Sequence, residues 1–504
     1  MTHPGLPWLW AAAVCVFMVL VGLWALASGP PAPARSRSIR LDGVPVLGAV
    51  IRAFSSSPVP LFVLKAVSAG FFLLVIAAGL WGTPVPERNL ATVLTWNVWW
   101  TGVVISVFFV GTFWCAVCPW DALAEWMVRR RLWRRGGDEN RLGLSVPPWL
   151  RSLWPALFLL LGLTWLELGL GITVSPYETA LLAVFMTVLV TVSMAVFERK
   201  AFCRYFCPVG RTLGMYARLA PVELRPRERE VCDRCETLEC YHGSSTVEPC
   251  PTHLTMGRLR QNTYCLSCCN CVQSCPHDNV SWRLRPQSLE AVRTVRPFWD
   301  EALFMVTLLA LTSFHGVTMM PFWEEWMSGL GRMIGDSGRL LASFSLLLAA
   351  VTAAAVLVYG AFVALTHRLC GGRASFREAF FNFALVALPP AFAYHLAHNI
   401  NHLARESSGL GALLLNPLGT GTVPLTMAER HMRAMTSPVV QDAIFSLQAA
   451  LLAFGFWLAV RIARHRGRDL YPGAGWRLAP MIVFAAAVTA LNLRLLMEPM
   501  VMRM

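Results

Sequence analysis

Long runs of hydrophobic residues, separated by short polar segments, extend over most of the chain. A transmembrane helix needs about 20 apolar residues, and about ten segments meet that requirement. The first segment lacks a basic leader and a clear small-residue cleavage site, so we interpret it as a span and not as a signal peptide. We therefore predict an all-α polytopic membrane protein. The ten predicted spans are 7–27, 59–81, 90–113, 150–171, 176–196, 300–320, 341–365, 377–403, 439–461 and 478–497.

The polar connections between these spans alternate in charge. The connections after the first, third, fifth, seventh and ninth spans are rich in arginine. The others are poorer: residues 82–89 contain only Arg88 as a basic residue, and residues 172–175 contain none. Because basic connections stay in the cytoplasm, the pattern predicts that the arginine-rich connections are cytoplasmic and that both termini lie outside.

Composition agrees with a membrane protein. The chain has 504 residues, of which 56% are hydrophobic and 14% charged, whereas charged residues make up about 25% of a soluble protein. The net charge of +14 belongs to the cytoplasmic connections, so it does not indicate nucleic-acid binding. Charged residues within the spans are few: Lys65, near a span end, can snorkel to the interface, and Glu167 lies near the outer face. Their small number disfavours a transporter. We find no phosphate-binding loop and no nucleophile–base set typical of a hydrolase or transferase.

Nine of the 15 cysteines lie between Cys232 and Cys275, in the hydrophilic connection after the fifth span. Dense cysteines in a reducing, cytoplasmic segment favour metal ligation over disulfides. The expected organisation is an N-terminal membrane domain (1–199), a cytoplasmic insert (200–299) and a C-terminal membrane domain (300–504).

Residues 265–276 read CLSCCNCVQSCP, the Cys-x2-Cys-x2-Cys-x3-Cys-Pro run of bacterial ferredoxins. An upstream run keeps the same order with longer intervals, Cys-x2-Cys-x4-Cys and then Cys-Pro. In two-cluster ferredoxins the fourth cysteine of each run binds the other cluster. A zinc knuckle does not need the Cys-Pro pairs. We predict two [4Fe–4S] clusters, with Cys269 left as a buried thiol. The cluster A set is Cys232, Cys235, Cys240 and Cys275, and the cluster B set is Cys250, Cys265, Cys268 and Cys271.

Two further cysteine pairs lie at cytoplasmic span ends. Cys115 and Cys118 precede Pro119, and Cys203 and Cys207 precede Pro208. Each Cys-Pro is expected to end the helical run, since proline biases the preceding residue to extended geometry. These four paired cysteines suit a third iron–sulfur centre or a redox-active thiol site if the two spans meet. The alternative is a pair of helix-ending motifs with reduced cysteines.

Residues 90–285 resemble the NapH/NosR family of membrane polyferredoxins, through the span-end Cys-Pro motifs and the two-cluster segment that follows. The resemblance implies a bacterial inner-membrane protein that passes electrons between the quinone pool and periplasmic reductases, or that supports their maturation. Two features depart from it: the first motif is Cys-x2-Cys-Pro, and residues 286–504 have no counterpart that we can match. No extended periplasmic flavin-binding domain of the NosR kind is evident, so a flavin is not expected.

Polar residues within spans are costly and are therefore functional candidates. His395, His398 and His402 follow each other at i+3 and i+4, on one helical face. His315 lies at similar depth in the sixth span (300–320), which crosses the membrane in the same direction as the eighth span (377–403). These four residues form the histidine group. Haem b between His315 and His395 or His398 is one hypothesis, with Gly316 making room for the macrocycle. The alternatives are a quinone or quinol site with Asn399 or Asn401, a structural role, or copper with Met319, Met320, Met427, His431, Met432 and Met435.

The sequence thus predicts a transmembrane electron-transfer protein. Electrons would pass through the two clusters, between the quinone pool or a membrane haem and a respiratory partner, with the protein as an electron-transfer component or a quinol-linked oxidoreductase subunit. The alternative function is a redox assembly or regulatory factor for another respiratory metalloenzyme. Membrane lipid and a redox partner are expected contacts, and nucleic acid is not.

Overall fold

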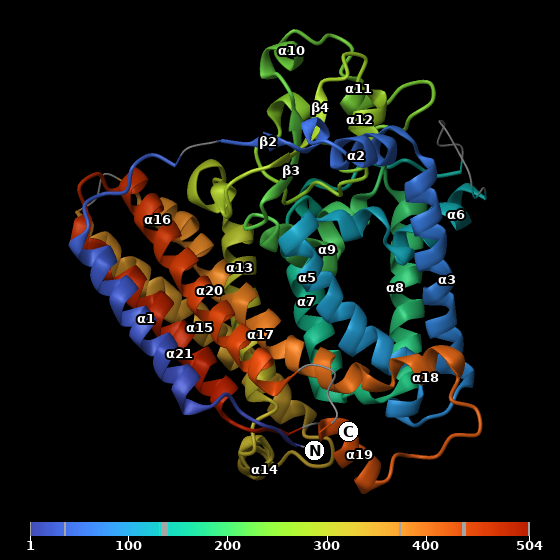
Figure 1. Ribbon diagram of the computed structural model, residues 1–504, viewed down its shortest axis with the longest axis vertical. Helices are drawn as coiled ribbons and strands as arrows, with labels where there is room; N and C mark the ends of the chain where they lie inside the picture. Colours follow the sequence, from blue (N-terminus) through green and yellow to red (C-terminus); the bar gives the residue numbers. More distant parts are fainter. Residues whose placement is uncertain are drawn as a thin grey trace.

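The computed structural model describes residues 2–34, 37–130, 132, 140–371, 374–435 and 440–501. Long apolar helices dominate this part of the chain (Figure 1). Within it, 9 helices are long and apolar enough to cross a membrane, which confirms the predicted all-α polytopic membrane fold. They are α1 (Trp8–Ala27), α3 (Val59–Trp81), α4 to α5 (Leu90–Val110), α8 (Pro176–Val196), α13 (Trp299–Val317), α15 (Leu341–Cys370), α16 to α17 (Phe376–Arg405), α20 (Gln441–Leu470) and η13 to α21 (Gly475–Met497).

The predicted span at 150–171 is the shortest. α7 (Trp154–Trp165) continues directly into the π-helical segment η6 (Leu166–Leu170). Together they form an apolar helix below the length of the other nine, yet still at the lower limit of about 17 residues for a crossing. The prediction of about ten spans therefore corresponds to nine long helices and this short one.

The helices pack in two groups (Figure 1). On one side α3, α8 and α6 (Pro119–Arg129) contact each other. On the other side α17 (Leu388–Glu406) packs against α13, α20 and α21, and α1 and α15 contact these helices in turn. α17 also contacts α5 (Trp100–Val110) between the groups. All residues from 383 to 399 are buried, so the polar side chains in this stretch of α17 face other helices and not lipid.

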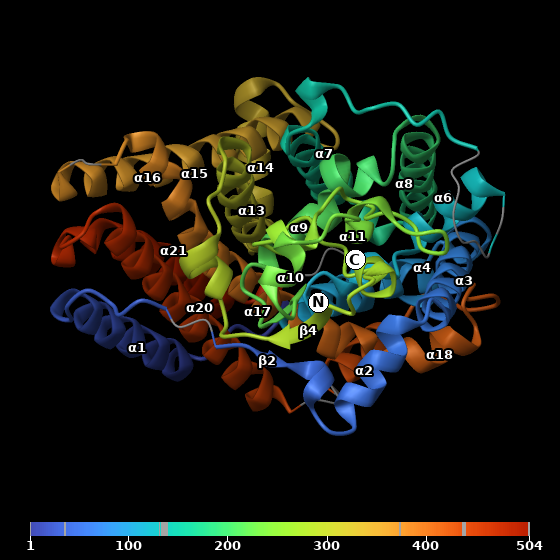
Figure 2. The same ribbon diagram turned by 90° about the horizontal axis from the view of Figure 1, so that it is seen from above.

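The cysteine-rich insert, residues 200–299, lies across one end of the helices, at the top of Figure 1. Seen from that side it covers the centre of the molecule, between the two helix groups (Figure 2). Its core is an antiparallel sheet in the order β2-β4-β3, formed by β2 (Ile39–Arg40), β4 (Val280–Leu284) and β3 (Val222–Pro226). β2 comes from the first connection of the chain, as does α2 (Leu47–Ser56), which contacts α12 (Asn270–Ser274) of the insert. The folded unit around the clusters is therefore larger than the segment that the sequence marked as the insert.

The two ends of the described chain meet at the opposite end of the helices. β1 (Thr2–His3) pairs antiparallel with β5 (Met500–Val501). Figure 1 shows both ends near α14 (Trp323–Ile334), far from the insert. The chain ends therefore share one face and the insert lies on the other, which agrees with the relative arrangement expected from the charge pattern.

Candidate functional site

The cluster A set surrounds one small cavity in the insert. All four thiols line a space of about 30 Å³, together with residues of the adjoining loops. The amide of Asn279 donates from Nδ2 to the Cys232 sulfur at 3.4 Å, and its backbone N–H donates to the Cys275 sulfur at 3.3 Å. Such N–H groups stabilise thiolate ligands, because they donate to the charged form. Donor chemistry and arrangement both fit a [4Fe–4S] cluster.

The longer x4 interval before Cys240 has a structural explanation. Leu238 adopts a left-handed backbone conformation, with φ of 48°, and starts the one-turn helix α11 (Glu239–His242). That turn brings Cys240 beside Cys232 and Cys275, whose electrostatic interaction with it adds to burial in raising the pKa of the Cys240 thiol. The longer interval thus forms an extra turn within the ligand loop and keeps Cys240 with the other three cysteines.

The cluster B set also converges. The pKa of the Cys271 thiol is raised by burial and then by its neighbours Cys268, Cys265, Cys269 and Cys250. Ser267 and Cys269 have positive φ angles of 57° and 62°, and these two left-handed residues turn the loop between its cysteines. Backbone N–H groups donate to the sulfurs of Cys265 and Cys250 at 3.4 and 3.3 Å. The predicted partners therefore lie together, including Cys250 from the distant run.

Cys269, the ninth cysteine of the block, lies next to the cluster B set but is not one of its predicted ligands. Its side chain is fully buried and packs with Leu61, Ala116 and Val117. Burial raises the pKa of this thiol to about 11. Cys269 thus contributes to the contact between the insert and the membrane helices.

Replacement of Cys269 by serine is expected to leave the iron content of the protein unchanged, because the side chain packs against apolar residues and not within a ligand set. Replacement of the adjacent Cys268 by serine is expected to lose the iron of cluster B, since it removes a thiolate ligand. Iron and acid-labile sulfide per chain measure both. Equal iron loss in the two variants would contradict the assignment.

Cys207 ends the π-helical segment η8 (Phe202–Phe206), as expected from the sequence, and Cys118 and Cys207 each also precede a new helix. α5 ends at Gly111, which has a positive φ of 61°. Cys118 then precedes α6, and Cys207 precedes α9 (Pro208–Tyr216), so that each proline occupies the first helical turn. Proline is favoured there because its missing N–H would be unpaired in any case. The Gly210 N–H donates to the Cys207 sulfur at 3.2 Å.

The two pairs meet although they come from different spans. A Cβ atom placed on Gly210 would lie 3.4 Å from the Cys207 sulfur and 3.8 Å from the Cys115 sulfur. Burial, followed by the nearby Cys207, raises the pKa of the Cys115 thiol to about 12. Burial raises the pKa of the Cys203 thiol, and Asp121, Cys207 and Cys118 raise this pKa further. The four paired cysteines thus form one partly buried group, and binding of iron there would release protons from the thiols.

None of the groups of His, Cys, Asp or Glu in the described ranges is arranged around a single metal ion. A cubane is wider than one ion, so its four thiols stand apart around it. This result is compatible with cluster ligation by the cysteine sets.

The three sets follow one another through the structure. Cys271 of cluster B shares an apolar contact region with Cys240 and Cys275 of cluster A. Another member of the cluster B set contacts the segment of the paired cysteines: the backbone carbonyl of Cys265 accepts a hydrogen bond from Thr112 Oγ1 at 2.6 Å. Thr112 precedes the short helix η4 (Phe113–Ala116), which carries Cys115. The cluster B cysteines thus lie between the cluster A cysteines and the four paired cysteines.

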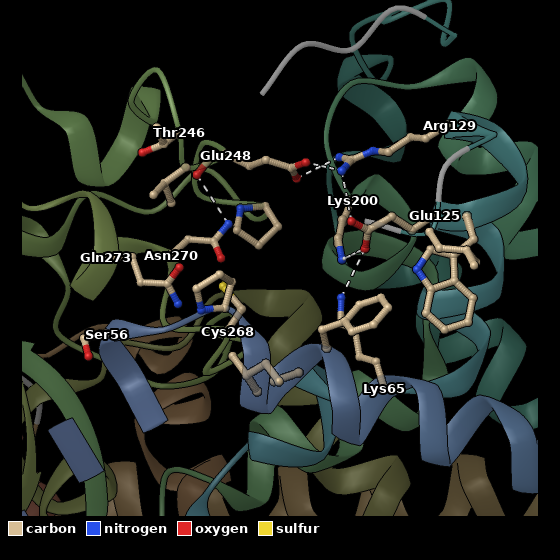
Figure 3. Close-up of a pocket in the computed structure, with 18 residues that line it drawn as sticks. Ser56, Lys65, Glu125, Arg129, Lys200, Thr246, Glu248, Cys268, Asn270 and Gln273 are labelled. Carbon is tan, nitrogen blue, oxygen red and sulfur yellow. Dashed lines mark hydrogen bonds and ion pairs between the residues drawn. The ribbon is translucent and has the colours of Figure 1, made fainter. Parts of the chain in front are cut away.

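A group of buried charges borders the paired cysteines and encloses a cavity of about 280 Å³ with Cys268 in its wall (Figure 3). Lys65 and Lys200 each lie 3.1 Å from a Glu125 oxygen, and both also pair with Asp121. Lys65 was expected to snorkel to the interface, but here it points to these carboxylates. Sequence spacing contains no signal for this group, which draws on α3, α6 and two loops. Its members are Lys65, Asp121, Glu125, Arg129, Lys200 and Glu248.

The structure also brings the histidine group together. The rings of His315 and His398 have centroids 5.0 Å apart, and Nε2 of His398 lies 3.3 Å from Nε2 of His402. His395 is oriented differently, with its Nδ1 3.2 Å from the Tyr216 hydroxyl. Glu167, which the sequence did not link to the histidines, lies 3.6 Å from His315 Nδ1.

This arrangement does not fit a haem. The cavity beside the histidines measures about 50 Å³, whereas pockets for ligands of drug size have about 300 Å³ or more. The space expected beside Gly316 is taken by Tyr394, whose hydroxyl would lie 1.8 Å from a Cβ on Gly316. The copper alternative gains no support, since Met320 is buried in the apolar core and the side chains of His431 and Met435 lie outside the described residues.

Replacement of Gly316 by alanine is expected to lower the free energy of unfolding by about 1–3 kcal/mol, the usual cost of overpacking. Tyr394 is fully buried and its ring cannot move aside. Thermal unfolding in detergent measures the change. Replacement of Gly102 by alanine is the control, because no atom lies within 4 Å of its Cβ position. A stable G316A protein would show that Tyr394 has room to shift.

Comparison with known proteins identifies the segments around the paired cysteines. Residues 92–136 and 179–225 match a family described as 4Fe-4S binding domain. These two segments contain Cys115 and Cys118, and Cys203 and Cys207, respectively. The match supports 4Fe–4S binding in the part of the chain where the two cysteine pairs meet.

Among curated proteins, YccM of Escherichia coli (strain K12) is 32% identical over 150 residues, which cover 28% of this chain and 40% of the relative. The chain thus matches about two fifths of YccM. The uncharacterized protein MJ0749 of Methanocaldococcus jannaschii is 24% identical over 227 residues, 44% of this chain and 83% of the relative. No solved structure matches. Motifs, geometry and relatives together support a ferredoxin-type iron–sulfur protein in a multi-pass membrane fold.

Proposed function

We propose that this protein transfers electrons between the quinone pool and a respiratory partner, through two [4Fe–4S] clusters and a third iron–sulfur centre held by the four paired cysteines. The name of YccM assigns that relative to electron transport, and the resemblance to NapH/NosR-type polyferredoxins supports the same role. The insert faces the cytoplasm of a bacterial inner membrane, as the positive-inside rule predicts for its flanking connections.

The observation that carries the proposal is the order of the three cysteine sets. Cluster A lies near the surface of the insert, cluster B shares contacts with both neighbours, and the paired cysteines lie at the ends of membrane helices. Clusters supply the one-electron chemistry, while the chain sets their positions and surroundings. The paired thiols are partly buried, and the ion pairs of Lys65 and Lys200 with Asp121 lie beside them.

Metal analysis with electron paramagnetic resonance of the purified protein tests this function. Three clusters require about twelve iron atoms per chain and two require about eight. A count near twelve, with three reducible signals, supports the proposal. A count near eight would remove the third centre, and fewer than about four would remove the cluster assignment itself.

The donor is tested separately. Catalytic reduction of the clusters by a short-chain quinol analogue is expected if the quinone pool is the electron source. Reduction by dithionite alone, without turnover by the quinol, would favour the assembly or regulatory role.

A further inference from the structure

A polar cavity lies among the membrane helices, below the paired cysteines. It measures about 50 Å³, and its lining includes Glu167, Thr212, His315, His395, His398 and Asn399. A site needs about 10–15 Å³ of such volume to hold one water, provided that polar partners are present. The cavity is therefore large enough for a few water molecules, although it is too small for a haem.

One buried polar side chain in the wall of this cavity has no hydrogen-bond partner among the described residues. Thr212 is 1% exposed, lines the cavity, and its hydroxyl has no hydrogen-bond partner among the described residues. Buried hydroxyl groups are nearly always hydrogen-bonded, to protein or to ordered water. Thr212 therefore indicates water inside the cavity, independently of the histidines.

The ionisable side chains around the cavity form a row of closely spaced groups. Glu167 on η6 lies 3.6 Å from Nδ1 of His315 on α13. The His315 ring lies next to that of His398, which in turn lies 3.3 Å from His402. Charged and ionisable groups at this depth are costly, and in membrane proteins they commonly form proton relays.

The two ends of this row of ionisable side chains differ in their surroundings. His315 and Glu167 are partly exposed, with 24% and 16% of their side chains accessible. One turn after His315, the Met319 carbonyl accepts a hydrogen bond from Val501 of the chain end. The relay therefore reaches toward the face that carries the termini. His395 and Tyr216 lie at the enclosed end.

The enclosed end connects to the paired cysteines through one short helix. α9 begins directly after Cys207, carries Thr212 in its middle and ends at Tyr216, whose hydroxyl contacts His395. At 1.5 Å per residue, Thr212 stands about 8 Å along the helix from Cys207. A charge change at the paired cysteines thus occurs about 8 Å along α9 from the cavity wall at Thr212. This separation is short enough for an electrostatic effect on the groups around the cavity.

We infer that this cavity is a hydrated proton-transfer site, which takes up a proton when the centre at the paired cysteines is reduced. The inference rests on the proposed electron-transfer function. The electron comes from a one-electron donor, by the proposed route reduced cluster B, and reduces iron of the centre. The proton comes from water at the face of the chain ends, passes Glu167 and His315, and binds the neutral imidazole of His398. Oxidation of the centre releases electron and proton again.

The groups that face these imidazoles come from four elements. Glu167 comes from η6, His315 from α13, Tyr216 from α9, and Tyr394 and His402 from α17 itself. Glu167 is the carboxylate among them, so it favours the protonated form of its histidine neighbour. Trp100 of α5 packs on His395 and has no ionisable group.

Proton counting during reduction of the purified full-length protein tests the inference. The one-electron donor is the methyl viologen radical cation, whose oxidation to the dication involves no proton, and a pH indicator reads a weakly buffered solution. Wild type is expected to take up about one proton per electron accepted by the third centre, because one imidazole binds one proton. His398→Gln and Glu167→Gln are expected to lose this uptake while they keep full iron content.

His367→Gln is the matched control, since His367 contacts Tyr471 and does not line the cavity. It is expected to retain the uptake. If His398→Gln does not fold, Glu167→Gln decides, because Glu167 is partly exposed. Reduction of wild type without proton uptake, or uptake at the wild-type level in both cavity variants, would overturn the inference. About twelve iron atoms without uptake would refute the proton site alone, whereas about eight would refute the third centre of the proposed function.

Discussion

Replacement of Cys207 by serine is expected to lower the iron content of the purified protein from about twelve to about eight atoms per chain, because one cubane holds four iron atoms and four thiolates bind it. Cys207 lies beside Cys115 at Gly210, and burial raises the pKa of its thiol. A serine hydroxyl is a far weaker ligand for iron than a thiolate. One electron paramagnetic resonance signal should disappear, and those of clusters A and B should remain.

The control for this experiment is Cys370 at the end of α15, whose sulfur lies near the carbonyl of Arg477 and far from the cysteine sets in sequence. Cys370→Ser should retain all iron. If Cys207→Ser also retained its full iron content, the paired cysteines would be helix-initiating residues with no metal, and the series of centres would end at cluster B.

Replacement of Asp121 by asparagine is expected to lower the free energy of unfolding by about 3–5 kcal/mol, the range observed when one partner of a buried ion pair is removed. Asp121 is 2% exposed and pairs with both Lys65 and Lys200. Loss of its charge leaves two enclosed ammonium groups to share Glu125, which already pairs with Arg129. Thermal unfolding in detergent should show a large fall in melting temperature.

Asp278→Asn provides a matched comparison at the surface. Asp278 also forms an ion pair, 2.7 Å from Arg227, but its side chain is 75% exposed. Exposed pairs contribute little, because water and salt screen them. This variant should unfold at the wild-type temperature. Similar behaviour of the two variants would show that water reaches Asp121 and that the charged group is not a structural unit.

The helical fold and the two cluster motifs could be predicted from the sequence because both are local. Burial in lipid requires long apolar runs, so each span is visible as a run of residues. Cluster ligands within one loop must follow at short intervals, so each ferredoxin run is visible as a spacing. The x4 interval before Cys240 is longer than the ferredoxin spacing, and it also has a local explanation in the left-handed conformation of Leu238.

Contacts between distant segments could not be predicted in the same way. Cys115 and Cys207 are both visible as members of Cys-Pro motifs, yet only packing of the helices decides that they share one site. The same holds for the partners of Lys65: a single lysine at a span end suggests snorkelling, and the carboxylates of α6 that bind it belong to another part of the chain.

The histidine group shows this division most clearly. By itself the sequence determined that His395, His398 and His402 share a helical face, since side chains three and four residues apart lie on one side of a helix. Only the tertiary structure decided what faces them. Tyr394 fills the space beside Gly316, Glu167 approaches His315, and α9 brings Tyr216 to His395. Local patterns specify which chemistry a helix can present, but the volume left between helices depends on side chains from all of them, and here it admits water and excludes a haem.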